Sequence, residues 1–448
     1  MSATATAVPP AACKASHFTS PDRPTWELYS TCIHCGLCLN HCPTYRVLGT
    51  EMDSPRGRIY QVLQVDAGRL EIGDSFVTHI DRCLGCRACE SACPSGVEYG
   101  RIVERARAEI EQNYRRPWLA TRLRRYFFGT VLRDYGVLAR WARMLRFYQR
   151  SGMQKLAPAS GLLKLLGLEE VESLAPTIDE TFFLDEIGRV YPVIGEQRAR
   201  VGFLAGCIAS VAFSELNRAT IRVLQQNGVE VVVPAGQHCC GALQAHAGYR
   251  EEARWVAQRN VDSFLAADVD VIVSNAAGCG ATLKEYVDLL EGDPAYREKA
   301  TTFTAKAKDV TEFLAGLGLR RPSRQLGGRV TYQDPCHLAH GQKVRSAPRE
   351  LLKAVGLEIV EMQHPDYCCG SAGTYNITQN ELAMQILEDK MDDVAATGAD
   401  TIVTANVGCM LQLRAGVARR KLKMDVLHVI ELLDRAYAPL SGRDSAAC

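Results

Sequence analysis

Two segments decide the character of this chain: Cys32-Ile-His-Cys-Gly-Leu-Cys-Leu-Asn-His-Cys-Pro43 and Cys83-Leu-Gly-Cys-Arg-Ala-Cys-Glu-Ser-Ala-Cys-Pro94. Each contains three cysteines spaced two residues apart, a fourth cysteine and a closing proline. Thiolates in this spacing are typical ligands of [4Fe–4S] clusters, and in two-cluster proteins the fourth cysteine ligates the other cluster. We therefore assign Cys32, Cys35, Cys38 and Cys93 to a first cluster, and Cys83, Cys86, Cys89 and Cys42 to a second.

Zinc is the alternative metal for such cysteines. Zinc sites use cysteines in C-x2-C pairs, four to a site, which leaves the triple run and its proline unexplained. The iron–sulfur interpretation is therefore favoured. Gly36 and Gly85 lie inside the loops, where a small residue lets backbone amides approach the sulfurs. Helical patterns over 58–65 and 97–110 predict a helical ferredoxin domain, unlike the small β-hairpin type.

The bulk composition places the chain among intracellular globular proteins. It has 448 residues, 47% of them hydrophobic, and 18 cysteines, too long for a secreted disulfide scaffold. A net charge of +1 gives no support for nucleic acid as a partner. No apolar run approaches the roughly 18 residues of a spanning helix. A G-x-G-x-x-G turn is absent, so we expect no FAD or NAD on this chain.

The second half of the sequence contains an internal repeat. Cys207 and Cys239 are 32 positions apart, and so are Cys336 and Cys368. Each second cysteine opens a Cys-Cys-Gly, and a last cysteine follows 40 or 41 positions later, at Cys279 or Cys409. Short β-branched runs alternate with helical patterns around these landmarks, which indicates two parallel α/β units. Each cysteine follows a predicted strand, where open parallel sheets usually build their sites.

Each repeat thus offers four cysteines: Cys207, Cys239, Cys240 and Cys279, then Cys336, Cys368, Cys369 and Cys409. Adjacent cysteines do not pair readily with each other, but both can face one site on a tight turn. A further iron–sulfur centre and a redox thiol site both remain open, beside inert buried thiols. His238 and His337 flank these cysteines as candidate ligands or proton relays, although most such histidines are only hydrogen-bonded.

A basic, aromatic stretch follows the ferredoxin motifs. It holds one acid, Asp134, and ten arginines: Arg115, Arg116, Arg122, Arg124, Arg125, Arg133, Arg140, Arg143, Arg146 and Arg150. Basic helices with aromatic residues lie on anionic membrane surfaces. An acidic partner subunit and a solvated helix packed by its aromatic side chains are the alternatives, and nothing else supports nucleic acid.

Taken together, the motifs resemble those of the iron–sulfur subunit of bacterial glycolate oxidase. The resemblance covers nearly all of residues 26–435 and rests on these features: Cys32 to Pro43, Asp53-Ser-Pro-Arg-Gly-Arg-Ile59, Asp81-Arg-Cys-Leu-Gly-Cys86, Cys93-Pro-Ser-Gly-Val97 and the two Cys-Cys-Gly repeats. The repeats also occur in heterodisulfide reductase and anaerobic glycerol-3-phosphate dehydrogenase subunits, which are the alternative assignment. That wider group often ends each repeat with C-x2-C. Here neither Cys279 nor Cys409 is followed by a second cysteine three positions later. This absence argues against a cluster of the heterodisulfide reductase kind.

The resemblance implies a subunit of an oxidoreductase complex. Flavin-containing partner subunits would oxidise glycolate or another 2-hydroxy acid to the 2-oxo acid. This chain would carry the electrons towards membrane quinone, without a catalytic residue of its own. It would lie in the cytoplasm, peripherally on the inner face of the cytoplasmic membrane.

The expected fold class is a multidomain α+β protein. We expect a disordered tail (1–25), a helical ferredoxin domain with two [4Fe–4S] clusters (26–112) and a basic helical connector (113–200). The first Cys-Cys-Gly repeat (201–319), the second (328–438) and a tail (439–448) follow.

Overall fold

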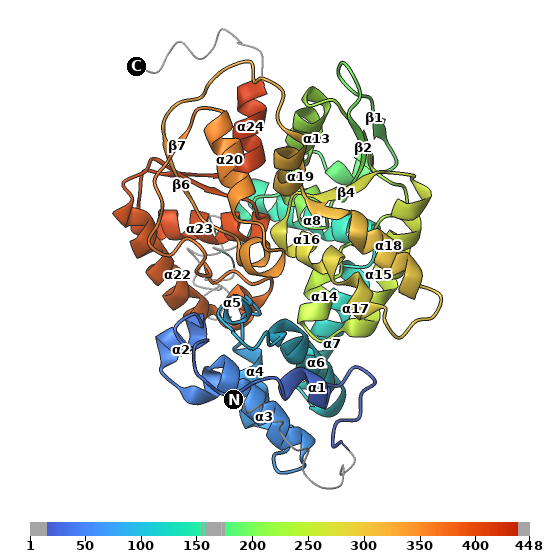
Figure 1. Ribbon diagram of the computed structural model, residues 1–448, viewed down its shortest axis with the longest axis vertical. Helices are drawn as coiled ribbons and strands as arrows, with labels where there is room; N and C mark the ends of the chain where they lie inside the picture. Colours follow the sequence, from blue (N-terminus) through green and yellow to red (C-terminus); the bar gives the residue numbers. More distant parts are fainter. Residues whose placement is uncertain (1–15, 155, 157–171, 173–174, 438–448) are drawn as a thin grey trace, which may run out of the picture.

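The computed structural model describes residues 16–154, 156, 172 and 175–437. Figure 1 shows a helical N-terminal domain lying against two α/β halves that stand side by side. This is the expected fold class. Cys13, Cys448 and the tail expected over 439–448 lie outside the described residues.

Helices are the only regular secondary structure of the N-terminal domain over residues 16–113, where loops connect them and no strand occurs. The helix that begins at Pro55 has a local start signal. The Ser54 side chain accepts a hydrogen bond from the Gly57 amide at 3.0 Å, and Pro55 occupies the first helical position. The elements are α1 (Trp26–Tyr29), α2 (Pro43–Leu48), η1 (Glu51–Asp53), α3 (Pro55–Asp66), α4 (Asp74–Asp81), α5 (Ala88–Ser91) and α6 (Tyr99–Asn113).

Residues 16–25 correct part of the expected disordered tail. The Phe18 side chain is buried in the core of the N-terminal domain. The Ser20 amide donates to Glu109 at 2.7 Å, and Asp22 forms an ion pair with Arg250 at 3.0 Å. One aromatic residue and two polar anchors therefore fix a segment whose composition is typical of a tail. Residues 1–15 lie outside the described part of the chain.

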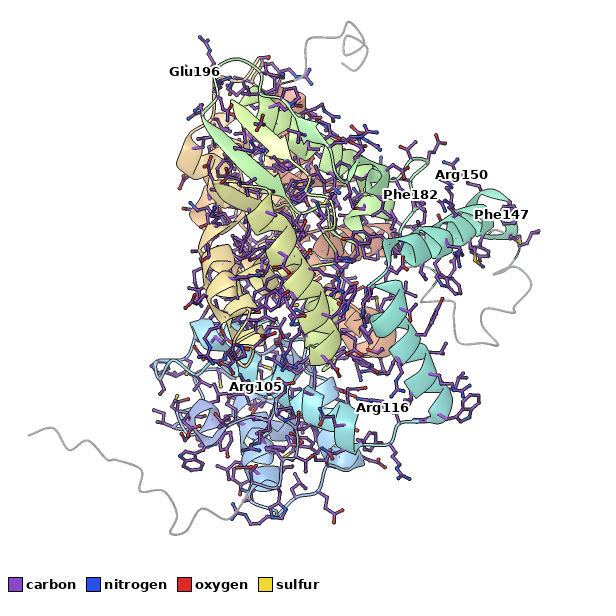
Figure 2. All side chains as sticks on the ribbon, turned by 90° about the vertical axis from the view of Figure 1, so that its right-hand side faces the viewer. Arg105, Arg116, Phe147, Arg150, Phe182 and Glu196 are labelled. Atoms are coloured by element: carbon purple, nitrogen blue, oxygen red, sulfur yellow. The ribbon has the colours of Figure 1, made fainter. Side chains whose placement is uncertain are left out.

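The connector begins with two helices that leave the N-terminal domain. These are α7 (Trp118–Tyr126) and α8 (Tyr135–Arg150), joined by the π-helical turn η2 (Phe127–Val131). Figure 2 shows α8 projecting from the body, with Phe147 and Arg150 near its outer end. Among the described helices, none is both long enough and apolar enough to cross a membrane.

The first half continues from η3 (Phe183–Glu186) into a five-stranded sheet. Its strands are β1 (Val190–Tyr191), β2 (Ala199–Phe203), β3 (Val229–Val232), β4 (Val271–Ser274) and β5 (Ala307–Asp309). Its helices are α12 (Ala209–Ala212), α13 (Ser214–Gln226), α14 (Ala242–His246), α15 (Arg250–Ala266), α16 (Ala277–Lys284), α17 (Tyr286–Leu289), α18 (Arg297–Lys306) and α19 (Val310–Leu317).

The second half repeats this plan around four strands: β6 (Arg329–Tyr332), β7 (Glu358–Ile359), β8 (Thr401–Thr404) and β9 (Asp425–His428). Its helical elements are η4 (His337–Gly341), α20 (Ser346–Ala354), α21 (Tyr375–Thr378), α22 (Asn380–Ala396), α23 (Val407–Arg420) and α24 (Val429–Tyr437).

The two sheets share one topology. The order β3-β2-β4-β5 in the first half corresponds to β7-β6-β8-β9 in the second, and all these neighbours pair in parallel. The first sheet adds β1, which comes from the connector and pairs antiparallel with β3. The parallel α/β prediction is thus confirmed, while β1, β5 and β9 are strands that the sequence pattern did not predict.

One continuous apolar core spans both halves and the connector. Helix α13 packs on α24 and α19 on α20, so the halves meet through helices. A smaller core joins the N-terminal domain to the second half: it contains Leu84 and Cys86 from one side and Cys368 and Tyr375 from the other. This packing places the second ferredoxin motif next to the second Cys-Cys-Gly repeat.

Candidate iron–sulfur centres

The four cysteines assigned to the second cluster surround one small cavity. Cys42, Cys83, Cys86 and Cys89 all line it, together with Arg58 and Tyr99. Cys42 stands directly before α2, Cys89 lies in α5, and the other two lie in the loop between α4 and α5. All four are buried. The structure therefore brings Cys42 to the triple run from the other motif, as the cross-over assignment requires.

The first-cluster cysteines lie nearer the surface. Cys35 is exposed, while Cys32, Cys38 and Cys93 are half-buried. Cys32 lies within electrostatic range of Cys93 and Cys35, and Cys38 within range of Cys32. Burial raises the pKa of Cys38 to about 11, against an opposing hydrogen bond from the Arg56 amide. The two candidate centres thus differ in access to solvent.

Backbone amides point at the sulfurs in a regular pattern. The Gly85 amide donates to Cys83 Sγ at 3.3 Å, which matches the role expected of that glycine. The amides of His34 and Ala88 make the corresponding bond to Cys32 and Cys86, each two residues earlier. Such donors stabilise thiolates over thiols. The backbone amides of these loops therefore favour charged sulfur ligands, independently of any bound metal.

Each Cys-Cys-Gly repeat also gathers its four cysteines. In the first half, Cys207 Sγ and Cys239 Sγ lie 3.4 Å apart, and Cys240 contacts both Cys239 and Cys279. These residues come from the ends of β2, β3 and β4, which meet at one edge of the parallel sheet. The grouping predicted from the spacing is present.

The second half repeats the arrangement. Cys368 contacts Cys336 and Cys369, and Cys369 in turn contacts Cys409. Gly370 has a left-handed φ of +90°, and a Cβ there would lie 2.5 Å from the Ala383 carbonyl oxygen. The corresponding Gly241 has a φ of +85°. Glycine permits the turn that presents two adjacent thiols to one site.

Unpaired polar atoms surround both groups of four thiols. In the described part of the chain, the hydroxyl of Tyr135 and Nε2 of Gln244 are buried without a hydrogen-bond partner beside the first group. Nε2 of Gln412 and the hydroxyl of Tyr332 are buried and unpaired beside the second. Buried donors without partners are rare in proteins, so these atoms indicate space for an acceptor-rich group.

The donor set fits iron–sulfur centres at the ferredoxin motifs, because soft thiolates, amide donors and an enclosing cavity coincide. All sixteen described cysteines are free thiols. Among the described residues, no three His, Cys, Asp or Glu side chains stand at the spacing of a single metal ion.

The two candidate histidines are held by other partners. A ring nitrogen of His238 lies 3.0 Å from the Arg133 carbonyl, and the ring stacks on Tyr135. Nε2 of His337 lies 3.0 Å from the carbonyl oxygen of Gly85. Burial lowers the pKa of His337 to about 3. His337 thereby joins the second repeat to the loop between Cys83 and Cys86.

Two contacts connect the candidate centres to one another. Cys86, on the second-cluster cavity, lies within electrostatic range of Cys336 in the second repeat. Asn406 joins the repeats, because its Nδ2 donates to Cys409 Sγ at 3.3 Å while its Oδ1 accepts from the Gly278 amide at 3.4 Å. Gly278 directly precedes Cys279. The second-cluster cavity thus lies near the second repeat, and the second repeat is hydrogen-bonded to the first.

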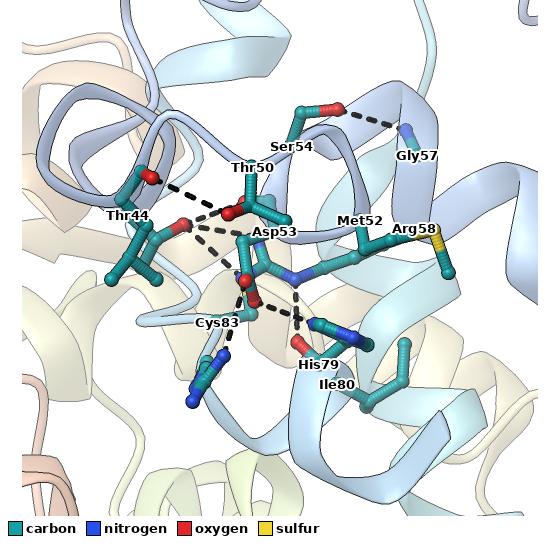
Figure 3. Close-up of polar contacts among 12 residues, drawn as sticks. Thr44, Thr50, Met52, Asp53, Ser54, Gly57, Arg58, His79, Ile80 and Cys83 are labelled. Atoms are coloured by element: carbon teal, nitrogen blue, oxygen red, sulfur yellow. Dashed lines mark hydrogen bonds and ion pairs between the residues drawn. The ribbon is translucent and has the colours of Figure 1, made fainter. Parts of the chain in front are cut away.

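A polar network lies beside the second-cluster cavity, and no motif in the sequence predicts it (Figure 3). Buried Asp53 lies 3.3 Å from Arg58 Nη2, 3.2 Å from Arg82 Nη1 and 3.0 Å from His79 Nδ1. The segment Asp53–Ile59 carried part of the family resemblance, but only the fold shows what it contacts. An acid and an arginine five positions apart, Asp53 and Arg58, with Pro55 and Gly57 between them, were the available signal.

A second ionic cluster lies where α6 meets the first repeat. It surrounds a polar cavity of about 370 Å³ that is lined by both signs of charge. Asp288 from α17 pairs with Arg101 and Arg105 from α6 and with Arg250 from α15. These ion pairs dock the N-terminal domain on the first half.

Comparison with known families agrees with this layout. Residues 29–97 match the 4Fe-4S dicluster domain, and residues 201–284 and 330–414 each match the cysteine-rich domain family. Residues 120–175 match the linker region of the glycolate oxidase iron-sulfur subunit.

Relatives with similar sequences cover nearly the whole chain. A probable glycolate oxidase iron-sulfur subunit of Bacillus subtilis is 40% identical over 90% of this chain and 92% of its own length. The glycolate oxidase iron-sulfur subunit of Escherichia coli is 33% identical over 92% of this chain and 94% of its own. Lactate utilization protein A of Geobacillus kaustophilus is 31% identical over 52% of this chain and 98% of its own. With its dicluster domain, linker and paired cysteine-rich repeats in this order, the chain belongs to the family of glycolate oxidase iron–sulfur subunits.

Proposed function

We propose that this chain is the electron-transfer subunit of a glycolate oxidase-type complex. Oxidation of glycolate to its 2-oxo acid releases two electrons and two protons, which a flavin on a partner subunit accepts. Iron–sulfur clusters pass electrons singly, and a quinone finally takes up two electrons and two protons. The observation that carries the proposal is the proximity of Cys86 and Cys336, which lie within electrostatic range of each other and belong to one packed cluster.

Electrons enter at the first cluster in this proposal. Its loop is the accessible one: Cys35 is exposed, and the neighbouring Ile33 and Leu37 are 68% and 59% exposed. Exposed apolar side chains beside a redox centre suit docking of a partner protein. The double variant Ile33→Glu, Leu37→Glu should abolish co-purification with the flavin subunit while the iron content stays unchanged.

The repeats extend the path as further redox centres. Four thiols with unpaired buried donors around them favour an iron–sulfur group over a bare thiol site in each half. Cys207, Cys239, Cys240 and Cys279 would hold the first, and Cys336, Cys368, Cys369 and Cys409 the second. Because neither repeat ends in C-x2-C, each proposed centre would have four cysteine ligands from the protein. Counting iron and sulfide in anaerobic protein decides this: about eight irons mean two cubes only.

The path ends beneath the connector, which we propose as the membrane-facing side. The hydroxyl of Tyr135, at the start of α8, is buried and lies within electrostatic range of the first-repeat thiols. The helices α7 and α8 expose a joined apolar face, since Trp141 Nε1 donates to the Tyr126 hydroxyl at 3.0 Å. The face comprises Trp118, Leu119, Leu123, Tyr126, Trp141, Met144 and Phe147. Figure 2 shows Phe147 and Arg150 at its outer end.

Four arginines of this connector suit an anionic lipid surface. Arg115, Arg122, Arg125 and Arg140 are exposed and form no ion pair with a described residue. Arg124 lies in the same stretch but is paired with Glu111 at 2.7 Å, so it is not one of these four. Basic and aromatic residues together bind the interface of acidic membranes.

Vesicle co-sedimentation tests the lipid contact. Replacing Arg115, Arg122, Arg125 and Arg140 with Gln should abolish binding to phosphatidylglycerol vesicles. The matched control replaces four exposed arginines outside the connector: Arg69, Arg321, Arg329 and Arg435. Equal binding of the two variants contradicts the membrane assignment, and loss of the flavin subunit from the connector variant alone indicates a protein partner.

The experiment that tests the whole proposal is the variant Cys83→Ser in the purified complex. It should remove one cluster and stop quinone reduction, while glycolate still reduces the flavin. Cys13→Ser is the matched control, because Cys13 belongs to neither motif. Normal quinone reduction by Cys83→Ser would refute the relay.

A further inference from the structure

The segment Ser54–Ile59 directs two arginines to two different centres. Arg56 and Arg58 stand two residues apart on α3, so their side chains leave the helix in different directions. Arg56 Nη1 donates to the His34 carbonyl in the first-cluster loop at 3.1 Å. Arg58 lines the second-cluster cavity instead. The same helix therefore presents one cation to each candidate cluster.

Arg58 is held in contact with a ligand residue. Its side chain is only 2% exposed. Its Nε donates to the His79 carbonyl at 2.6 Å, and both terminal nitrogens donate to the Thr44 hydroxyl at 3.1 Å. That hydroxyl oxygen lies 3.2 Å from Cys42 Sγ. A single hydroxyl thus separates the buried guanidinium from a sulfur assigned to the second cluster.

The charge of Arg58 is only partly balanced. Its acidic partner Asp53 is fully buried and also pairs with Arg82 at 3.2 Å (Figure 3). One carboxylate therefore faces two guanidinium groups, which remain protonated in proteins. Because the site is buried, water screens the remaining positive charge weakly.

Arg56 is in the opposite situation. It forms a bidentate pair with Glu51, at 2.6 Å and 3.2 Å, and its side chain is 30% exposed. The carboxylate cancels its charge and solvent screens what remains. Arg56 therefore anchors the first-cluster loop with little net field.

We propose that Arg58 raises the reduction potential of the second cluster above that of the first, and so directs electrons inward. A [4Fe–4S] cluster gains one negative charge when it accepts an electron, and a nearby buried cation favours that form. One electron then leaves the exposed first cluster and enters the buried second cluster. The inference rests on the proposed ligand sets; Arg58 acts on the cluster through the field and Thr44.

A redox titration followed by electron paramagnetic resonance tests this on the full anaerobic chain. The second-cluster signal is identified as the one that Cys83→Ser removes. Arg58→Met should shift its midpoint to lower potential, whereas Asp53→Asn, which removes the compensating charge, should shift it higher. Arg56→Met is the matched control from the same helix and should leave the second-cluster midpoint in place.

Opposite shifts from Arg58→Met and Asp53→Asn support the proposal, because general loosening of the site moves both variants alike. An unchanged midpoint, or a shift of the same sign in both, overturns it. If Arg58→Met loses the cluster, Arg58→Lys and Asp53→Asn decide: Lys should stay near the wild-type midpoint and Asn should lie above it. A wild-type chain without iron would instead overturn the proposed function itself.

Discussion

Asp288 is the carboxylate on which the docking of the N-terminal domain depends, and Asp288→Ala should destabilise the protein markedly. Arg105 Nη2 lies 3.0 Å from it and Arg250 Nη2 lies 3.2 Å away, and these arginine side chains are only 7% and 3% exposed. Arg101 pairs with it as well. Removing the carboxylate leaves buried guanidinium groups short of a countercharge.

The expected cost is about 3 kcal/mol. Breaking a buried ion pair by deleting one partner costs about 3–5 kcal/mol. The lower end applies because the Asp288 side chain is 18% exposed, and because Arg105 keeps Glu291 and Arg250 keeps Asp22. The control is Asp262→Ala, whose pair with Lys299 is half exposed on both sides and should be worth at most about 1 kcal/mol.

Urea denaturation of the iron-loaded chain, followed by circular dichroism, measures the difference. Burial pushes the pKa of Asp288 up, but Arg250, Arg105 and Arg101 outweigh it and hold the pKa below its usual range. A depressed pKa gives stability that is present above the unfolded value, about 3.9, and lost as the pH falls below it. The cost of Asp288→Ala should therefore be constant from pH 8 to pH 5. A cost equal to that of Asp262→Ala would refute this account of the interface.

Three further substitutions follow from local geometry. Gly57→Ala should reduce iron content and lower the melting temperature, since a Cβ there would lie 1.9 Å from the Glu51 carbonyl oxygen. Gly370→Ala should lower the melting temperature more than Gly241→Ala, because its Cβ would meet the Ala383 backbone at 2.5 Å, whereas that of Gly241 meets a movable Val256 methyl at 3.0 Å. Burial raises the pKa of Asp309 to about 6, so its charge weakens the fold as the pH rises from about 4 to above 6. Asp309→Asn should therefore flatten the urea stability profile over that range and gain roughly 3 kcal/mol at pH 8; an unchanged slope would contradict it.

Much of the site could be predicted because its signals are local or periodic. The triple cysteine runs indicate iron–sulfur ligands from their spacing alone, and the repeat appears by comparing Cys207–Cys279 with Cys336–Cys409. The parallel strands followed from short apolar runs between helical patterns. Residues 16–25 show the limit: their polar composition predicts a tail, and only long-range contacts to Glu109 and Arg250 fix them.

The sequence by itself determined which residues can ligate metal and which segments form the ferredoxin domain and the two α/β repeats, because ligand spacing and hydrophobic periodicity act over a few residues. Only the tertiary structure decided that Cys86 lies near Cys336, that Asn406 joins the repeats, and that Arg58 rather than Arg56 is the buried cation. These relations arise when separate units dock. Burial, and with it the strength of every charge beside the centres, depends on what packs against a residue from elsewhere in the chain.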